Sequence, residues 1–322
     1  MKAKTLVKII VSLALIVALI IFAGPEQILD SASTANPFFL FIALLTTHVI
    51  FVFKFLKWNA MCRIGANVPI KKTSSIYLVG SFFGMVTPSK VGELIKFHYL
   101  SKQGMPKASA LSISVSDKAF DILMITIFSV IGVFMISGGA ELFGPFVVIS
   151  IILILIATYM VFDKRVFLKI GGFVLRRSKI ITNALKIKRK ADSETLEDFY
   201  QPLQKMKSRP LLIAYMLLMT FLLWFFVAVQ VLFILLAFGS EINIIHSLIT
   251  VCVGAVVGLI PITVSGVGTR DAAIMAILAT IGIGSGIAIL SSIIYTFFSM
   301  VIPAIIGGII YLKSKEYGEV ND

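Results

Sequence analysis

The sequence predicts an all-α, polytopic membrane protein with a single transmembrane domain over residues 1–322. Hydrophobic residues make up 58% of the chain, and the mean hydropathy is +1.02. Several uncharged runs are about 20 residues long, enough for a helix to cross roughly 30 Å of hydrocarbon. These runs are continuous, whereas a β-barrel would show short segments that alternate between apolar and polar residues. The composition also excludes two soluble domains, which the length alone would allow.

Six of these runs are predicted to be full spans. They are expected near residues 5–24, 37–57, 107–137, 143–162, 210–238 and 286–312. The first run follows Lys2 and Lys4, as the core of a signal peptide would. Its apolar part is too long for such a core, and no small-residue cleavage site follows it, so we interpret it as a retained span.

Basic residues assign the loops to the two sides of the membrane. Lys and Arg concentrate in cytoplasmic loops, so "KWNAMCRIGANVPIKK" and the basic connector at 163–209 are predicted to be inside. The loops "GPEQILDSASTANP", "SGGAEL" and "GSEIN" carry no basic residue and are predicted to be outside. The connector is expected to be a solvated or amphipathic helix near anionic headgroups. The basic cytoplasmic loops account for the net charge of +13, so this charge does not indicate a nucleic-acid partner.

Two stretches, near residues 73–105 and 246–283, must each begin and end on one side of the membrane. The first lies between a cytoplasmic loop and a span that leaves from the cytoplasm. The second lies between an outside loop and a last span that runs from the outside to the inside. We therefore predict two re-entrant helical hairpins of opposite orientation. With this count, both termini are cytoplasmic.

The predicted tips of these two hairpins share a pattern. "GMVTPSKVGELIKFHYL" (84–100) and "GLIPITVSGVGTRDAAIMAIL" (258–278) each contain Gly, Pro, Ser-x-Val-Gly and then an acidic residue. Each is followed by a short helix, a glycine and a helix start that is rich in small residues. We interpret the cores near 73–137 and 246–312 as an inverted internal repeat. Chance similarity between glycine-rich segments is the alternative.

The residues of the tips favour an anion site within the membrane. Backbone that leaves a helix inside a bilayer must be buried in protein or line a wet cavity. Each restarting helix points its N-terminal amides at its tip, where Lys90 and Arg270 lie, and Glu93 and Asp271 are available to hold these cations. Broken helices in opposed hairpins are typical of transporters built from inverted repeats. The predicted tip backbone consists of Pro88, Ser89, Gly92, Pro261, Ser265, Gly266 and Gly268.

A third charged cluster lies in "SVSDKAFDIL", with Asp117, Lys118 and Asp121. Asp117 and Asp121 are four residues apart and share a helix face. A charge at mid-membrane costs about 2.5–3.5 kcal/mol, so a buried cluster would need partners. Two alternatives remain open. The cluster forms a wall of the site that partners Arg270 or Lys90, or it lies at a solvated helix end.

The remaining polar residues predict neither a cofactor nor a metal site. Cys62 and Cys252 have no partner at metal-ligand spacing and are interpreted as buried thiols. Lys96 and His98 are expected at the cytoplasmic interface.

The three motifs resemble the membrane region of lysylphosphatidylglycerol synthases, which is also found in stand-alone, flippase-like integral membrane proteins. "TPSKVGELIKFHYL", "SVSDKAFDIL" and "PITVSGVGTRDAA" carry this resemblance, which covers nearly the whole chain. Ser265 replaces a usual glycine and Asp271 replaces Glu, changes that bear on the substrate more than on the architecture. The soluble aminoacyl-transferring domain of the synthases does not follow the last span within the 322 residues. The resemblance therefore implies lipid translocation or a related membrane role, and not aminoacyl transfer.

The leading hypothesis is a flippase-like transporter of the cell membrane that moves an anionic, modified or sugar-linked lipid between leaflets. Its expected partner is a membrane phospholipid or a polyprenyl-linked lipid; whether copies of the chain form a homo-oligomer stays open. Lys90 and Arg270 would bind the headgroup phosphate, and Glu93 and Asp271 would orient them or bind a cationic headgroup. One alternative is a non-transporting membrane subunit or enzyme of polyprenyl-linked sugar or cell-envelope lipid synthesis, although no Asp-x-Asp pair or Cys/His cluster supports catalysis. Another is a scaffold whose charges only stabilise its fold.

The predicted topology can be tested with single cysteines. Cysteines introduced at Ser33 and Ser240 should react with a membrane-impermeant thiol reagent added outside, because both lie in loops without basic residues. A cysteine at Ser193, in the basic connector, should not react. Labelling of position 193 from the outside would contradict this topology.

Overall fold

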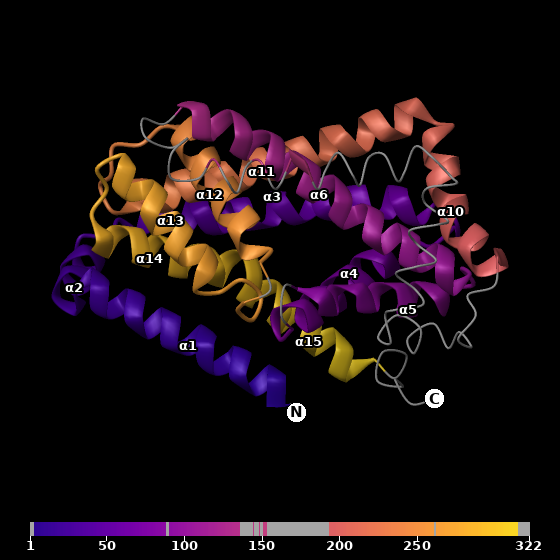
Figure 1. The fold of residues 1–322 in the computed structure, drawn as a ribbon, viewed down its shortest axis with the longest axis horizontal. Coiled ribbons are helices and arrows are strands. Elements are labelled where there is room, and N and C mark those ends of the chain that lie inside the picture. The colour runs from indigo at the N-terminus through magenta and orange to yellow at the C-terminus, as the bar shows by residue number, and fades with distance from the viewer. Residues whose placement is uncertain are drawn as a thin grey trace.

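The computed structural model describes residues 3–87, 90–135, 144, 148, 151–152, 193–260 and 262–314. These residues form helices and the turns between them, as the sequence predicts (Figure 1). The predicted span at 143–162 lies almost wholly outside the described residues. The connector at 163–209 is described only from α10 (Ser193–Lys207) onward.

Within the described part of the chain, three helices are long and apolar enough to cross a membrane. They are α3 (Pro37–Cys62), α11 (Pro210–Ala237) and the continuous helix over Ser285–Lys313. A fourth crossing results if α1 (Ala3–Ala23) and α2 (Pro25–Ser33), which meet at a 77° bend, form one broken span. The six predicted spans are thus matched in part, and their number stays a prediction.

Local sequence explains where the apolar helices begin. Pro37 and Pro210 each occupy the first turn of a helix, where a missing N–H is not needed. The Asn36 side chain accepts a hydrogen bond from Phe38 N at 3.0 Å. Asn243 caps α12 (Ile244–Gly258) in the same way, through His246 N at 2.9 Å. These caps satisfy amides that would otherwise lack partners.

Helices α3 and α11 pack against each other along their length. Gln230 on α11 donates from Nε2 to the carbonyl of Ala43 at 3.0 Å and to Thr47 Oγ1 at 2.7 Å, both on α3. These contacts are buried. Helix α3 also packs on α4 (Ile70–Met85) of the first broken segment, and α11 packs on α12 of the second.

Both stretches that the sequence marks as broken do fold back on themselves. In the first, α4 (Ile70–Met85) packs against the 3₁₀ helix η1 (Val91–Ile95) and against α5 (Lys96–Ser101). In the second, α12 packs against α13 (Thr269–Thr280). Gly104 and Gly282 follow these segments with φ of 90° and 82°, a conformation that favours glycine. The orientation of each segment relative to a bilayer stays a prediction.

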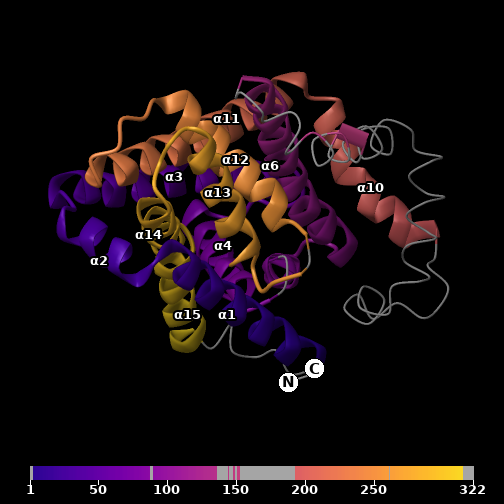
Figure 2. The ribbon, with the colours of Figure 1, turned by 60° about the vertical axis from the view of Figure 1, so that its left-hand side comes forward.

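The helices that follow each segment pack on the other segment. Helix α6 (Lys107–Met135), which follows the first segment, packs on α12 of the second. The long C-terminal helix follows the second segment and comprises α14 (Ser285–Thr296), a π-helical segment η2 (Phe297–Val301) and α15 (Ile302–Lys313). Its last part, α15, packs on α4 of the first (Figures 1 and 2). Glycines lie at both contacts: Gly132 on α6 against Ile249, and Gly307 on α15 against Leu78.

The contact between α15 and α4 should not tolerate a larger residue at Gly307. A Cβ atom there would overlap the backbone carbonyl of Leu78, so Gly307→Ala should destabilise the protein by about 1–3 kcal/mol. The measurement is the melting temperature of the detergent-purified protein. Gly284→Ala is the control, because no atom lies within 4 Å of a Cβ there and its φ of −60° suits alanine. Equal melting temperatures for the two variants would contradict this packing.

Candidate functional site

The tip of the first broken segment is closed by hydrogen bonds to Thr87. Its Oγ1 donates to the carbonyl of Phe83 at 2.9 Å and accepts from Gly92 N at 2.7 Å. A side chain at position 92 would overlap Phe83 O, so only glycine fits. Lys90 adopts the left-handed conformation, with φ of 56°. Pro88 and Ser89, also predicted for this tip, lie outside the described residues.

The second tip uses the same kinds of residues. Ser265, Gly266 and Gly268 have φ of 55°, 77° and 93°. A Cβ at Gly266 would lie 2.7 Å from the carbonyl of Gly258, so this position requires glycine both for its φ and for space. Gly268 N donates to Asp271 Oδ2 at 2.7 Å, which caps α13. Pro261 lies outside the described residues.

The two tips touch through their backbones. Ser265 N donates a hydrogen bond to the carbonyl of Thr87 at 3.1 Å. Val264 N donates to Ser12 Oγ of α1 at 2.8 Å. Polar backbone freed by the two helix breaks is therefore paired between the segments and with α1. Such pairing is what irregular backbone requires in an apolar environment.

Arg270 and Asp271 form a buried pair that holds α13 to the C-terminal helix. Arg270 Nη2 lies 2.8 Å from Asp271 Oδ1 and also donates to Thr296 Oγ1, and its Nη1 lies 2.9 Å from Met300 Sδ. Ser292 donates to Asp271 Oδ1 at 2.5 Å. Both charged residues are 5% exposed or less. They do not line the cavity described below, and their contact with a lipid headgroup stays a prediction.

Asp117 lies at the centre of a second buried charge network. Its Oδ2 lies 2.7 Å from Lys96 Nζ and its Oδ1 lies 3.0 Å from Lys57 Nζ. Lys57 also pairs with Asp121, and the Lys96 ammonium lies 4.4 Å from the centroid of the Trp58 ring. Asp117 is fully buried, so it does not lie at a solvated end, and its partners are neither Arg270 nor Lys90.

The expectation for Lys96 is wrong. It was predicted at the cytoplasmic interface, but its side chain is 1% exposed. Its ammonium group contacts the Asp117 carboxylate and lies over the rings of Trp58 and Tyr77. These contacts replace the hydration that an interfacial lysine would keep.

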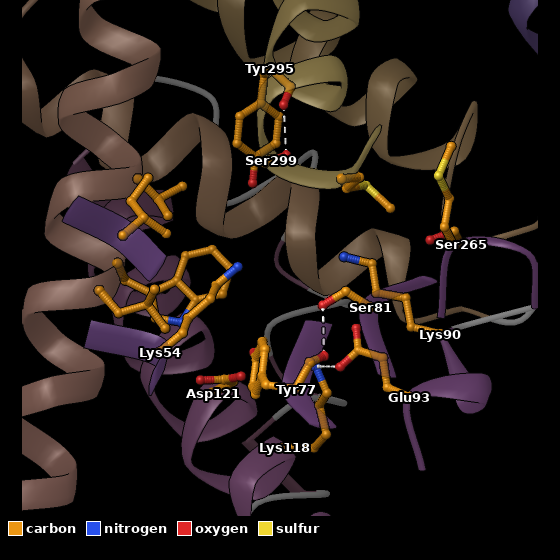
Figure 3. Close-up of a pocket in the computed structure, with 16 residues that line it drawn as sticks. Lys54, Tyr77, Ser81, Lys90, Glu93, Lys118, Asp121, Ser265, Tyr295 and Ser299 are labelled. Carbon is orange, nitrogen blue, oxygen red and sulfur yellow. Dashed lines mark hydrogen bonds and ion pairs between the residues drawn. The ribbon is translucent and has the colours of Figure 1, made fainter. Parts of the chain in front are cut away.

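A cavity of about 100 Å³ with charged and apolar walls lies between the two broken segments, α3, α6, α11 and the C-terminal helix at α14 and η2 (Figure 3). Lys90 and Glu93 enter it from the first tip, and Ser265 enters it from the second. Lys54 comes from α3, and Lys118 and Asp121 come from α6. The Lys118 ammonium pairs with the Glu93 carboxylate, an interaction drawn as a dashed line in Figure 3. The apolar and aromatic part of the wall comprises Ile50, Tyr77, Met85, Leu223, Trp224, Val227, Tyr295 and Met300.

Of the predicted site residues, the structure brings Lys90, Glu93, Asp121 and Ser265 to one cavity. Sequence reasoning missed Lys54, which lines this cavity, and Lys57, which pairs with Asp117 and Asp121 behind it. A signal was present. Lys54 and Lys57 are three residues apart on a mostly apolar helix, so their side chains lie on one face of it. Charged side chains on such a helix are expected to face the protein interior.

The buried network predicts that the two aspartates differ in their contribution to stability. Asp117→Asn would leave Lys96 without its carboxylate and Lys57 with only Asp121, at a cost of about 3–5 kcal/mol. Asp121→Asn should cost less, because Lys57 keeps Asp117 and the Asp121 side chain is 15% exposed. Melting temperatures in detergent measure the difference. A larger loss for Asp121→Asn would contradict this network.

Comparison with known proteins identifies relatives over almost the whole length. Residues 9–307 match the lysylphosphatidylglycerol synthase transmembrane region. A UPF0104 membrane protein of Methanothermobacter thermautotrophicus is 22% identical over 91% of this chain and 90% of its own length. A UPF0104 membrane protein of Methanocaldococcus jannaschii is 23% identical over 97% of this chain and 95% of its own, and one of Pyrococcus horikoshii is 22% identical over 97% and 98%. The match over residues 9–307, together with the apolar helices, shows that the chain is a membrane protein and belongs to the family of the lysylphosphatidylglycerol synthase transmembrane region.

Proposed function

We propose that the protein is a flippase-like transporter that moves an anionic, modified or sugar-linked lipid between the leaflets of the cell membrane. The observation that carries this proposal is the charged cavity between the two helix breaks. Three lysines, Glu93 and Asp121 line it, in a protein that has three helices long and apolar enough to span a membrane among its described residues. Ionisable groups are costly within a membrane, and where they occur they mark the path of a polar substrate. A lipid headgroup would occupy the cavity while its acyl chains stay in the bilayer.

The reciprocal packing of the two broken segments supports an inverted repeat. Each unit comprises a long helix, a segment broken at its tip and a following helix. The long helices α3 and α11 pack on each other, α6 packs on α12, and α15 packs on α4. This exchange of equivalent contacts is what a pseudo-two-fold axis produces. In transporters of this kind the substrate binds near the bilayer midplane between the repeats, and rocking of one repeat against the other exposes the site to each side in turn.

The two segments would then be re-entrant hairpins, one reached from each side of the membrane. In support, positive φ occurs at Lys90 and at Gly266, which hold the same place in the shared Ser-x-Val-Gly pattern. The basic loops place both termini in the cytoplasm under the positive-inside rule. The tips would meet near the midplane, where Ser265 N and Thr87 O form their hydrogen bond.

Transport is tested by reconstitution into liposomes that contain fluorescently labelled lipids with different headgroups. The wild-type protein should make at least one labelled lipid accessible to an impermeant quencher from both leaflets. Glu93→Gln should slow this movement about tenfold or more, since it leaves Lys118 in the cavity wall without its carboxylate. Lys71→Gln should move lipid at the wild-type rate, because Lys71 is exposed at the start of α4 and away from the cavity.

Arg270 should not be replaceable by lysine. Its guanidinium group reaches Asp271, Thr296 and Met300 at once, and an ammonium group cannot span these positions. Arg270→Lys and Arg270→Gln should therefore both reduce lipid movement in the same assay. Size-exclusion profiles separate a transport defect from a folding defect. Wild-type movement in both variants would contradict a role of this pair in transport, and absence of movement for every lipid tested with the wild-type protein would favour the non-transporting alternative.

A further inference from the structure

The charged groups that line the cavity do not neutralise one another. Glu93 pairs with Lys118, and Asp121 pairs with Lys57 from behind the wall. The other two cations, Lys54 and Lys90, form no ion pair with any acidic residue that the structure describes. The Lys54 ammonium lies 4.5 Å from the centroid of the Phe51 ring. Together, the cavity wall and the charge network behind it contain five lysines and three carboxylates, an excess of two lysines.

Two hydrogen-bond donors in the same wall also lack an acceptor. Trp224 Nε1 and Ser265 Oγ are buried, and neither has a hydrogen-bond partner within the described ranges. An indole N–H can only donate, so its acceptor has to come from outside the residues that the structure describes. By contrast, the hydroxyls of Ser81 and Ser299, also in the wall, donate to the carbonyls of Tyr77 and Tyr295. Within the described wall, the groups of Trp224 and Ser265 are thus left without a partner, whereas the Ser81 and Ser299 hydroxyls are satisfied.

Ser265 adds a conformational argument. Its φ of 55° is unfavourable for a residue with a Cβ atom, and glycine would adopt it without strain. The side chain is nevertheless present, and Ser265 is 3% exposed, with its hydroxyl buried at the cavity wall. A strained residue with an unpaired hydroxyl at a cavity is the combination expected where a ligand supplies the missing partner.

We infer that the cavity selects a headgroup with net negative charge and several acceptor oxygens, that is, a phosphomonoester or diphosphate lipid. This inference rests on the proposed function and defines its substrate class. Lys54 and Lys90 would supply the charge, and Trp224 and Ser265 would supply directed donors to the phosphate oxygens. A zwitterionic headgroup has no net charge, so it would leave the excess of two lysines unmatched. A cationic aminoacyl headgroup would be repelled by both lysines.

The test measures binding to the purified full-length protein and does not depend on transport. Dioctanoyl phosphatidate, dioctanoyl phosphatidylcholine and lysyl-phosphatidylglycerol are titrated by calorimetry in the same detergent. Phosphatidate should bind at least about tenfold more tightly than either of the others. Lys54→Gln and Lys90→Gln should each weaken phosphatidate binding about tenfold. Lys54→Arg should retain most of the affinity, and Lys71→Gln should bind as the wild type does.

Two further variants test the neutral donors. Trp224→Phe and Ser265→Ala remove one donor each and keep the ring or the Cβ atom, so each should weaken phosphatidate binding severalfold without a change in melting temperature. Unchanged affinity in both, together with wild-type affinity in Lys54→Gln, would overturn the assignment. Tight binding of lysyl-phosphatidylglycerol would overturn the charge selection.

Titration with inorganic phosphate and pyrophosphate shows whether the cavity binds a lipid headgroup or a free phosphate. Weak binding of both, relative to phosphatidate, supports a lipid headgroup. Binding as tight as that of phosphatidate would overturn the lipid as the source of the anion. Failure of the proposed function would give a different result. Phosphatidate would then bind, and Lys54→Gln and Lys90→Gln would weaken its binding, but no lipid would cross the bilayer in the liposome assay. Intact transport with equal binding of all three lipids would contradict only this inference.

Discussion

The backbone hydrogen bond between Ser265 N and Thr87 O is the contact on which the rest of the site depends. A chain that interrupts its helices within an apolar environment has to pair the freed amides and carbonyls, since each unpaired group costs several kcal/mol. Here a backbone amide of the second tip pairs with a backbone carbonyl of the first. Gly92 and Gly266 pack closely against Phe83 and Gly258 within their own tips, and this local packing shapes the two tips. The tips are therefore held together, and the cavity with Lys90 and Ser265 in its wall lies beside their contact.

Burying so much charge is possible because each carboxylate in this region serves a lysine. Asp117 has two lysine partners, and Glu93 has one. Aromatic rings around Lys96 complete its environment. A buried ion pair gives little net stability compared with an apolar replacement, but loss of one partner is costly. The network is thus better explained by a need for charge near the cavity than by a need for stability. Because every carboxylate of the network already has a lysine partner, Lys54 and Lys90 remain available to bind an anion.

The helix breaks were predictable from sequence, and the partners of the charges were not. Proline, serine and glycine act through local backbone geometry, so the motifs around Gly92 and Gly268 indicated where helices stop and restart. Ion pairing depends on which helix faces become neighbours, which one sequence does not specify. Lys96 was therefore placed at an interface, although α3 and α6 enclose it, and the cavity position of Lys54 was not anticipated. Four of the predicted site residues nevertheless share this cavity, because the tip motifs already restrict where their side chains lie.

The π-helical segment η2 divides the C-terminal helix between the two halves of the molecule. Before it, α14 packs on α13, and after it, α15 packs on α4. A π turn contains one extra residue and weakens the regular hydrogen-bond ladder, and Pro303 just beyond it removes another backbone donor. The C-terminal helix is thus held by α13 before the π-helical segment and by α4 after it. Its backbone hydrogen bonding is weakest between these two contacts. Met300 lies at this point and its sulfur contacts Arg270, so the Arg270 and Asp271 pair is attached to the helix where its hydrogen bonding is least regular.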